Sequence, residues 1–243
     1  MKTKMTTQTV MGIFSKTTDS NLVEATGLSG LDFIILDMEH GPATLETMHN
    51  HVRAAKISGI TSIIRVKGME SHAISSALDT GADGVQVPNI STAQQAREAV
   101  NSARFYPNGN RGVCRFVRAA QFGEQDRNEY FATANKKIVV LQVEGVEGIK
   151  NLDEILAVNG FDVLFIGPYD LSQSIGKPGE VESEEVMGLM QEIATKAKAK
   201  GIVLGAFSDN LERNESLKKQ GFNYIAYSVD LNVYIDACKK IIG

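Results

Sequence analysis

Short apolar runs recur along the whole chain, and a small motif introduces four of them. The runs with this motif are Phe33–Asp37, Gly84–Pro88, Val163–Gly167 and Tyr224–Ser228. The residues directly before them are Gly30-Leu31-Asp32, Gly81-Ala82-Asp83, Gly160-Phe161-Asp162 and Gly221-Phe222-Asn223. Glycine suits the left-handed backbone that ends a helix, and the Asp or Asn then leads into a buried strand. The motif therefore predicts a helix end followed by a strand start.

Four further runs of similar composition lack the full motif: Thr9–Phe14, Ser62–Val66, Ile138–Glu144 and Val203–Phe207. The runs are rich in Val and Ile without clean alternation, which is typical of parallel strands buried on both faces. Helical patterns lie between them: Leu45–Lys56, Ser71–Thr80, Thr92–Ala103, Leu152–Val158, Glu184–Lys200 and Asn210–Lys219. Eight strands separated by helices predict one domain over residues 1–243, a single (β/α)8 TIM barrel. A doubly wound open sheet is the alternative, but no Gly-x-Gly-x-x-Gly turn follows the first strand.

Composition narrows the function classes. The net charge of -4 gives no general attraction to nucleic acid or to an anionic membrane. No apolar run approaches the roughly 20 residues that span a bilayer. The polar N-terminus has no signal-peptide pattern, and two cysteines are too few for a disulfide framework. We therefore expect a cytoplasmic protein with no nucleic-acid or membrane partner.

The ends of the predicted strands carry polar residues where a TIM barrel places its reactive groups. Glu144 and Asp170 follow neighbouring strands, so their carboxylates can converge at the barrel mouth. Two carboxylates with water and a substrate oxygen form a site for a hard cation such as Mg²⁺ or Mn²⁺. The alternative is that each carboxylate caps a helix or lies in a solvated loop.

His40 and Arg65 are the other candidates at strand ends. His40 lies past the second strand near Asp37 and Glu39, where a histidine can act as a general base or simply bond to the backbone. Arg65 ends an apolar strand, so its charge needs a partner. That partner is either an anionic substrate or enolate, or a carboxylate of a neighbouring strand.

Two further features are ambiguous. Asp79 lies in the last turn of a predicted helix, where the helix dipole disfavours a carboxylate and a specific partner is expected. The segment 104–123 carries four arginines among aromatic residues. It is either a lid or anion-binding loop over the mouth, or a basic surface or subunit contact.

Several motifs occur in one order along the chain. They are Asp37-Met38-Glu39-His40-Gly41-Pro42, Arg65, Asp79-Thr80-Gly81-Ala82, Val87-Pro88, residues 106–112, Gln142-Val143-Glu144 and residues 165–172. In this order they resemble the HpcH/HpaI aldolase family, the metal-dependent pyruvate aldolases related to citrate lyase β chains. The similarity runs from about residue 10 to the C-terminus and implies a barrel of the phosphoenolpyruvate/pyruvate-domain type.

The resemblance implies a role for each matching residue. Glu144 and Asp170 match the metal ligands, with Mg²⁺ or Mn²⁺ expected and Co²⁺ or Zn²⁺ as alternatives. His40 matches the general base, and Asp79 the carboxylate that raises its basicity. Arg65 matches the group that stabilises the pyruvate enolate. Substrate contacts are implied for Arg65, Gln142, Tyr169 and Asp170.

The implied reaction is cleavage of a 4-hydroxy-2-oxo acid into pyruvate and an aldehyde, by a homo-oligomer that is commonly a hexamer in relatives. A thioester lyase of the citrate or malyl-CoA type is one alternative, although such relatives need extra chain to hold CoA. A non-catalytic barrel subunit is another alternative, although all the site residues are present. Differences around residues 114–118, at Tyr169 and at Phe207 leave the aldehyde open.

Overall fold

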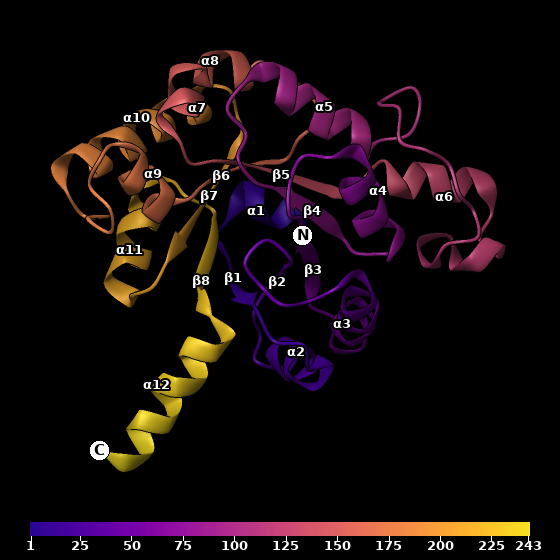
Figure 1. Ribbon diagram of the computed structural model, residues 1–243, viewed down its shortest axis with the longest axis horizontal. Coiled ribbons are helices and arrows are strands. Elements are labelled where there is room, and N and C mark those ends of the chain that lie inside the picture. The colour runs from indigo at the N-terminus through magenta and orange to yellow at the C-terminus, as the bar shows by residue number, and fades with distance from the viewer.

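The computed structural model describes residues 1–243 and contains a closed barrel of eight parallel strands (Figure 1). The strands are β1 (Val10–Ser15), β2 (Phe33–Asp37), β3 (Thr61–Arg65), β4 (Gly84–Val87), β5 (Ile138–Val143), β6 (Val163–Ile166), β7 (Val203–Ser208) and β8 (Tyr224–Val229). They pair in chain order, and β8 pairs with β1 to close the ring. The predicted (β/α)8 barrel is confirmed, and each of the eight predicted strands is present.

Helices surround the barrel and return the chain from the end of one strand to the start of the next. The longer ones are α2 (Ser20–Leu28), α3 (Leu45–Ser58), α4 (Ser71–Asp79), α5 (Ala93–Ala103), α10 (Glu184–Ala199) and α11 (Leu211–Gln220). Shorter ones are α1 (Lys2–Thr7), α6 (Arg127–Ala134), α7 (Val146–Lys150), α8 (Leu152–Ile155), α9 (Pro168–Ser174) and the 3-10 helix η1 (Arg118–Gly123). The sequence pattern did not predict α1, α2, α7 or α9, which are short or only weakly amphipathic.

The glycine motif before four strands has the predicted geometry. Its glycines have φ angles of 88°, 85°, 102° and 93° at Gly30, Gly81, Gly160 and Gly221. Three of the motifs continue with Asp, whose carboxylate accepts a backbone N–H of the preceding strand. The donors are Met11 to Asp32 (2.9 Å), Ser62 to Asp83 (3.1 Å) and Val139 to Asp162 (2.9 Å). Each Asp therefore ties the start of its strand to the neighbouring strand.

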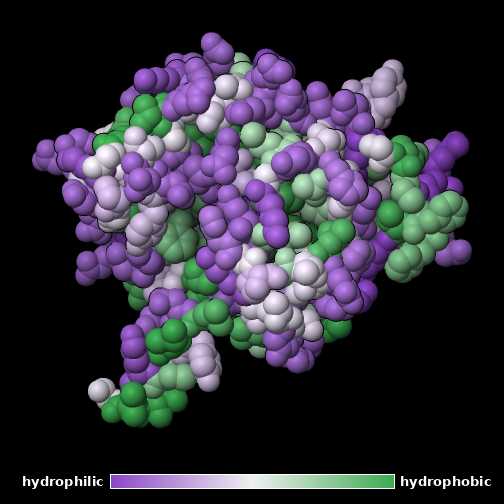
Figure 2. All heavy atoms as spheres, viewed as in Figure 1, coloured by the Kyte–Doolittle hydropathy of each residue, from purple (hydrophilic) through white to green (hydrophobic).

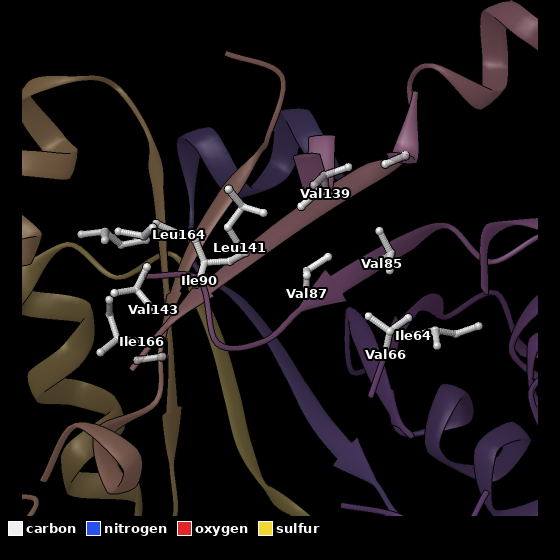
Figure 3. Close-up of a cluster of buried hydrophobic side chains, with 14 of the residues drawn as sticks. Ile64, Val66, Val85, Val87, Ile90, Val139, Leu141, Val143, Leu164 and Ile166 are labelled. Atoms are coloured by element: carbon white, nitrogen blue, oxygen red, sulfur yellow. The ribbon is translucent and has the colours of Figure 1, made fainter. Parts of the chain in front are cut away.

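Successive side chains of each strand point alternately out of and into the barrel. The outward ones, such as Ile64, Val85, Leu141 and Leu164, form a continuous apolar layer beneath the helices (Figure 3). The inward ones form a second cluster that includes Val10, Phe33, Ile63, Phe165 and Tyr224, and Met5 of α1 joins it at the N-terminal end of the barrel.

Toward the C-terminal end of the barrel the inward side chains change from apolar to polar. They include Asp37, Arg65, Gln86 and Gln142, all of which are buried. This polar layer lies directly above the apolar one and forms the floor of the barrel mouth.

The C-terminal helix α12 (Asp230–Ile242) differs from the other outer helices because it extends away from the barrel (Figure 1). Its apolar side chains lie on the surface, where Figure 2 shows a concentration of hydrophobic residues. Exposed ones include Leu231, Tyr234, Ile235, Ile241 and Ile242. No helix of the chain is long and apolar enough to cross a membrane.

Candidate active site

A cavity of about 280 Å³ opens at the C-terminal mouth of the barrel. Its lining draws on residues at the ends of strands all round the ring: Phe14, Lys16, His40, Arg65, Gln142, Phe165, Gly167, Pro168, Tyr169, Asp170, Phe207 and Val229. The structure therefore brings five of the predicted site residues to one place, namely His40, Arg65, Gln142, Tyr169 and Asp170. The cavity is near the lower size limit of small-molecule sites.

Arg65 is held firmly at the end of β3. Its Nε and Nη2 donate to the two carboxylate oxygens of Asp37 at 2.9 and 2.7 Å, and its Nη1 lies 3.1 Å from Glu39 Oε2. Register explains the first pair, because Asp37 and Arg65 are opposite one another on β2 and β3. Burial alone would raise the pKa of Asp37, but the hydrogen bonds and charge of Arg65 hold that pKa below its usual value. The predicted strand-end ion pair is present, and Arg65 still reaches the cavity.

The carboxylates of Glu144 and Asp170 meet beside Gly167. A Cβ atom on Gly167 would lie 2.8 Å from Glu144 Oε2 and 3.3 Å from Asp170 Oδ2. Only a glycine at this position leaves the space between the two carboxylates open. Two like charges so close together repel each other unless a cation or a proton lies between them.

The environment of Glu144 favours its protonated form when no cation is bound. Burial, together with the charges of Asp170 and Glu39, raises the pKa of Glu144 to about 7, although the hydrogen bond from Gln142 acts in the opposite direction. The backbone N–H of Asn89 also donates to Glu144 Oε1, at 3.0 Å. A divalent cation would relieve this repulsion, and the oxygen donors suit a hard ion. No cluster of three or more His, Cys, Asp or Glu side chains is present, so water and substrate oxygens would complete the coordination shell.

Two buried glutamines support Glu144 from below. The Gln86 amide donates to Gln142 Oε1, and the Gln142 amide donates to Glu144 Oε2. Because the Gln142 amide nitrogen is a donor, the side chain orients the carboxylate that lies two residues further along the chain. Gln142 also lines the cavity, as predicted for a substrate contact.

His40 and Tyr169 lie at the rim of the cavity. The side chain of His40 is exposed, with Nε2 3.9 Å from Glu39 Oε2. The Tyr169 hydroxyl bonds to Asp209, and its ring lies edge-on to Phe207 with centroids 6.0 Å apart. Both residues can reach a bound molecule from the solvent side.

Residues 10–237 match the family described as HpcH/HpaI aldolase/citrate lyase. The chain belongs to this family. A 2-keto-3-deoxy-L-rhamnonate aldolase from Klebsiella pneumoniae is 35% identical over 235 residues, covering 96% of this chain and 87% of that protein. An HpcH/HpaI aldolase/citrate lyase family protein from Burkholderia cenocepacia J2315 is 30% identical, with a TM-score of 0.94 over 99% of this chain and 96% of its own.

A more distant solved structure is the citrate lyase beta subunit of M. tuberculosis, complexed with oxaloacetate and magnesium. It is 15% identical with a TM-score of 0.60, covering 93% of each chain, so the likeness concerns the fold. The resemblance predicted from the sequence motifs is confirmed, and the chain is an enzyme of an aldolase family.

Asp79 lies away from the cavity. It ends α4, which runs back toward the start of β4, and its carboxylate pairs with the Arg111 guanidinium. His40 follows β2 at the mouth, so Asp79 and His40 lie at opposite ends of the barrel within one chain. The role that the family resemblance implies for Asp79 therefore stays a prediction.

Within its own chain, the arginine-rich segment 104–123 does not cover the mouth of the barrel. Its guanidinium groups bond near the N-terminal ends of the strands. Arg104 donates to the carbonyls of Lys137 (2.7 Å) and Gly160 (2.9 Å), and Arg118 to that of Thr80 (3.1 Å). The segment follows α5 and leads to α6, and Arg104 and Arg118 hold it to the barrel.

Sequence reasoning missed two contributions to the site. Asp37 and Glu39 appeared only as neighbours of His40, yet both hold Arg65. Lys16 was not singled out, yet it lines the cavity. The alternation of inward and outward side chains along β1 could have identified Lys16, because Lys16 continues the inward series that begins with Val10.

Proposed function

We propose that the protein is a divalent-metal-dependent aldolase that reversibly cleaves a 4-hydroxy-2-oxo acid into pyruvate and an aldehyde. The observation that carries the proposal is the meeting of the Glu144 and Asp170 carboxylates beside Gly167, since Gly167 and Asp170 line the cavity that also contains Arg65. A 2-oxo acid offers two oxygens to a cation and one negative charge to a guanidinium. The related aldolase from Klebsiella pneumoniae supports this class of reaction.

Glu144 and Asp170 would hold the cation, with Gln142 orienting Glu144 from below. The oxygen ligands favour Mg²⁺ or Mn²⁺, with Co²⁺ or Zn²⁺ as alternatives. When bound, the cation supplies Lewis-acid polarisation of the keto oxygen. Pyruvate would also contact Gln142 and the Tyr169-Asp170 segment.

Arg65 would stabilise the negative charge that develops on the keto oxygen as the carbon–carbon bond breaks. A guanidinium has five N–H donors, and two of them donate to the Asp37 carboxylate. The remaining N–H groups can donate to an oxygen in the cavity. Because Asp37 and Glu39 fix the guanidinium before substrate binds, little reorganisation is needed during the reaction.

His40 would take the proton from the hydroxyl of the 4-hydroxy-2-oxo acid and return it in the reverse direction. Its exposed position at the rim lets it exchange that proton with solvent. Asp79 would raise the basicity of His40. Because these residues lie at opposite ends of the barrel within one chain, Asp79 would have to come from another copy.

A homo-oligomer is part of the proposal, and a hexamer is the expected state. Its support is α12, which exposes Leu231, Tyr234, Ile235, Ile241 and Ile242. Contiguous apolar surface of this kind is typical of protein contacts. The two cysteines, Cys114 and Cys238, are unpaired, which fits the expected cytoplasmic location.

Exchange of the pyruvate methyl protons with D₂O tests the proposal without knowledge of the aldehyde. NMR should show exchange with Mn²⁺ and none after EDTA. Glu144→Gln keeps the shape of the side chain but removes its charge, so exchange should fall by about 100-fold or more. Arg65→Lys removes the planar fork and should lower exchange by about 100- to 1000-fold.

Glu147→Gln is the matched control, because Glu147 is an exposed glutamate in α7, the helix that follows Glu144. It should exchange like the wild type. If the wild type shows no exchange with any of the four metals, or if Glu144→Gln exchanges normally, the proposed function is wrong.

A further inference from the structure

Asn89 contacts carboxylates that belong to both halves of the candidate site. Its backbone N–H donates to Glu144 Oε1 at 3.0 Å, and its side-chain amide donates to Glu39 Oε1 at 3.1 Å. Glu144 belongs to the proposed cation site, whereas Glu39 lies against Arg65. The mechanism described above gives Asn89 no role.

The backbone of Asn89 is held in an uncommon conformation. Its φ angle is 60°, in the left-handed region that glycine and asparagine adopt most readily. On its C-terminal side, the backbone N–H of Ile90 donates to the Gln142 carbonyl of β5 at 2.9 Å. The Ile90 side chain is buried in the apolar layer beneath the helices (Figure 3). The chain is therefore fixed next to β5, and this directs the Asn89 N–H toward Glu144.

Two carboxylates each give one oxygen to Asn89 and keep the other for a different purpose. Glu144 Oε2 faces the space beside Gly167, where the cation is proposed to bind. Glu39 Oε2 is buried and accepts no hydrogen bond, and Arg65 Nη1 lies 3.1 Å from it. The bonds to Asn89 therefore determine which way each carboxylate points.

Glu39 is close enough to the cation site to compete for it. Burial and, after the charges of its cationic neighbours, the charge of Asp170 affect the pKa of Glu39, which is raised. The pKa of Glu144 is raised by burial and by the charges of Asp170 and Glu39. The three carboxylates thus act on one another. Without the bond to Asn89, Glu39 would be free to turn from Arg65 toward the cation site. There its carboxylate would occupy a position that a substrate oxygen needs.

We propose that Asn89 is a positioning residue that keeps Glu39 on Arg65 and out of the cation site. The inference rests on the proposed function and deepens it. Holding Glu39 in place leaves coordination positions open for the 2-oxo acid and keeps the Arg65 guanidinium directed at the same molecule. Asn89 itself touches no reacting atom.

The test measures how much oxalate tightens the binding of Mn²⁺. Oxalate is a stable anion that offers two oxygens to a cation and negative charge to a guanidinium, as a 2-oxo acid does. Calorimetry gives the Kd of Mn²⁺ without oxalate and with saturating oxalate, after correction for Mn²⁺–oxalate complexes in solution. The ratio of these two Kd values is the readout. We expect a ratio of about ten or more for the wild type, because both ligands use one site.

Asn89→Gly keeps the left-handed backbone and the N–H for Glu144 but removes the amide that holds Glu39. It should lower the ratio about fivefold, the value of a hydrogen bond to a charged group at an exposed residue. Mn²⁺ binding without oxalate should not weaken, because the bond to Glu144 remains and Glu39 is released.

A double-mutant cycle tests whether Asn89 acts through Glu39. In a Glu39→Ala background, Asn89→Gly should change the ratio by less than about twofold, because the bond it removes is already absent. Asn159→Gly is the matched control, since Asn159 is an exposed asparagine in the segment before β6, at the N-terminal end of the barrel. Its ratio should equal that of the wild type.

Three results would overturn the role of Asn89. They are an unchanged ratio in Asn89→Gly, an equal fall of the ratio in the Glu39→Ala background, and weaker Mn²⁺ binding by Asn89→Gly without oxalate. The wild type separates this inference from the proposed function. If it binds Mn²⁺ and exchanges pyruvate protons while Asn89→Gly behaves like it, only the role of Asn89 is wrong. If the wild type binds no Mn²⁺, both proposals are wrong.

Discussion

The two ends of the barrel both contain charged side chains, but their charges are satisfied in different ways. At the N-terminal end, Asp162 accepts the Val139 N–H and lies 2.7 Å from the Lys2 ammonium and 3.4 Å from the Arg104 guanidinium. Arg104 in turn donates to two backbone carbonyls. Each charge there has partners within the chain.

At the C-terminal mouth, charges of like sign are left facing each other. Glu144 and Asp170 meet at Gly167, and the charges that act on Glu144 include other carboxylates. Lys16 has no hydrogen-bond partner for its ammonium. At the N-terminal end the paired charges hold strands together. At the mouth Arg65 is paired with Asp37 and still reaches the cavity, and the repulsion between Glu144 and Asp170 marks the place where a ligand would complete the structure.

The repulsion between carboxylates at the mouth should have its largest effect on the pH dependence of metal binding. Because the pKa of Glu144 is raised to about 7, the group must lose a proton before it binds a cation. Mn²⁺ affinity should therefore fall about tenfold per pH unit below 7, or about 100-fold between pH 7 and 5. Calorimetric titrations from pH 5 to 8 measure it. Glu147→Gln should keep this slope and Glu144→Gln should bind weakly at every pH. A flat wild-type profile would contradict the prediction.

The raised pKa of Glu144 also affects the stability of the metal-free protein. This stability should fall as the pH rises, whereas metal affinity should increase. A carboxyl group whose pKa is raised by folding stabilises the folded protein less and less as the pH rises from the usual pKa of the group toward about 7. The metal-free protein should melt at a lower temperature at pH 7.5 than at pH 5.5, and Glu144→Gln should reduce that difference.

Removing a charge at the N-terminal end should affect stability and leave the chemistry intact. Asp162→Asn keeps an oxygen for the Val139 N–H but leaves the buried Arg104 without its carboxylate. We expect a loss of about 1–2 kcal/mol in the free energy of unfolding, because one charged partner of a buried group is removed. Chemical denaturation measures it, and pyruvate proton exchange should persist.

Asp153→Asn is the matched control, since Asp153 pairs with Lys196 on the surface and is 72% exposed. Its unfolding free energy should change by less than about 0.5 kcal/mol. An equal loss of unfolding free energy in the two variants would show that the carboxylate beside Arg104 contributes no more to stability than a surface carboxylate.

The fold was predictable because its signals are local. Buried strands appear as apolar runs, and Gly30, Gly81, Gly160 and Gly221 end helices with positive φ whatever lies around them. Helices α7 and α9 were missed because they are short and depend on tertiary contacts more than on amphipathic pattern.

The candidate site was predictable only in part. Strand ends located Arg65, Glu144 and Asp170, since a parallel barrel brings all strand ends to one mouth. The sequence did not reveal that Asp37 holds Arg65, because this depends on the register between β2 and β3. The predicted helix end at Asp79 already indicated the N-terminal end of the barrel, whereas the family pattern gives residue order and not position.

Asp79 offers the sharpest test of the division between the two ends. If the carboxylate serves His40, it does so from a second copy, because within one chain it pairs with Arg111 at the end of α4. His40→Asn and Asp79→Asn should each lower aldol turnover by about 100-fold or more, since general-base catalysis is lost. Co-expressed, the two variants should regain about a quarter of wild-type turnover, because that share of sites in a randomly mixed oligomer combines both intact residues.

A site built within a single chain would give a different result. Every site of the mixture would then contain one defect, and turnover would stay at the level of the separate variants. Co-expression of His40→Asn with Arg65→Lys is the control, because both residues line the cavity of the same chain and no mixed site contains both intact. Recovery in the Asp79 mixture alone would mean that the N-terminal end of one barrel contributes to the chemistry at the mouth of another. Charges at the N-terminal end would then be structural within their own chain, and Asp79 would also be functional at the interface with another chain.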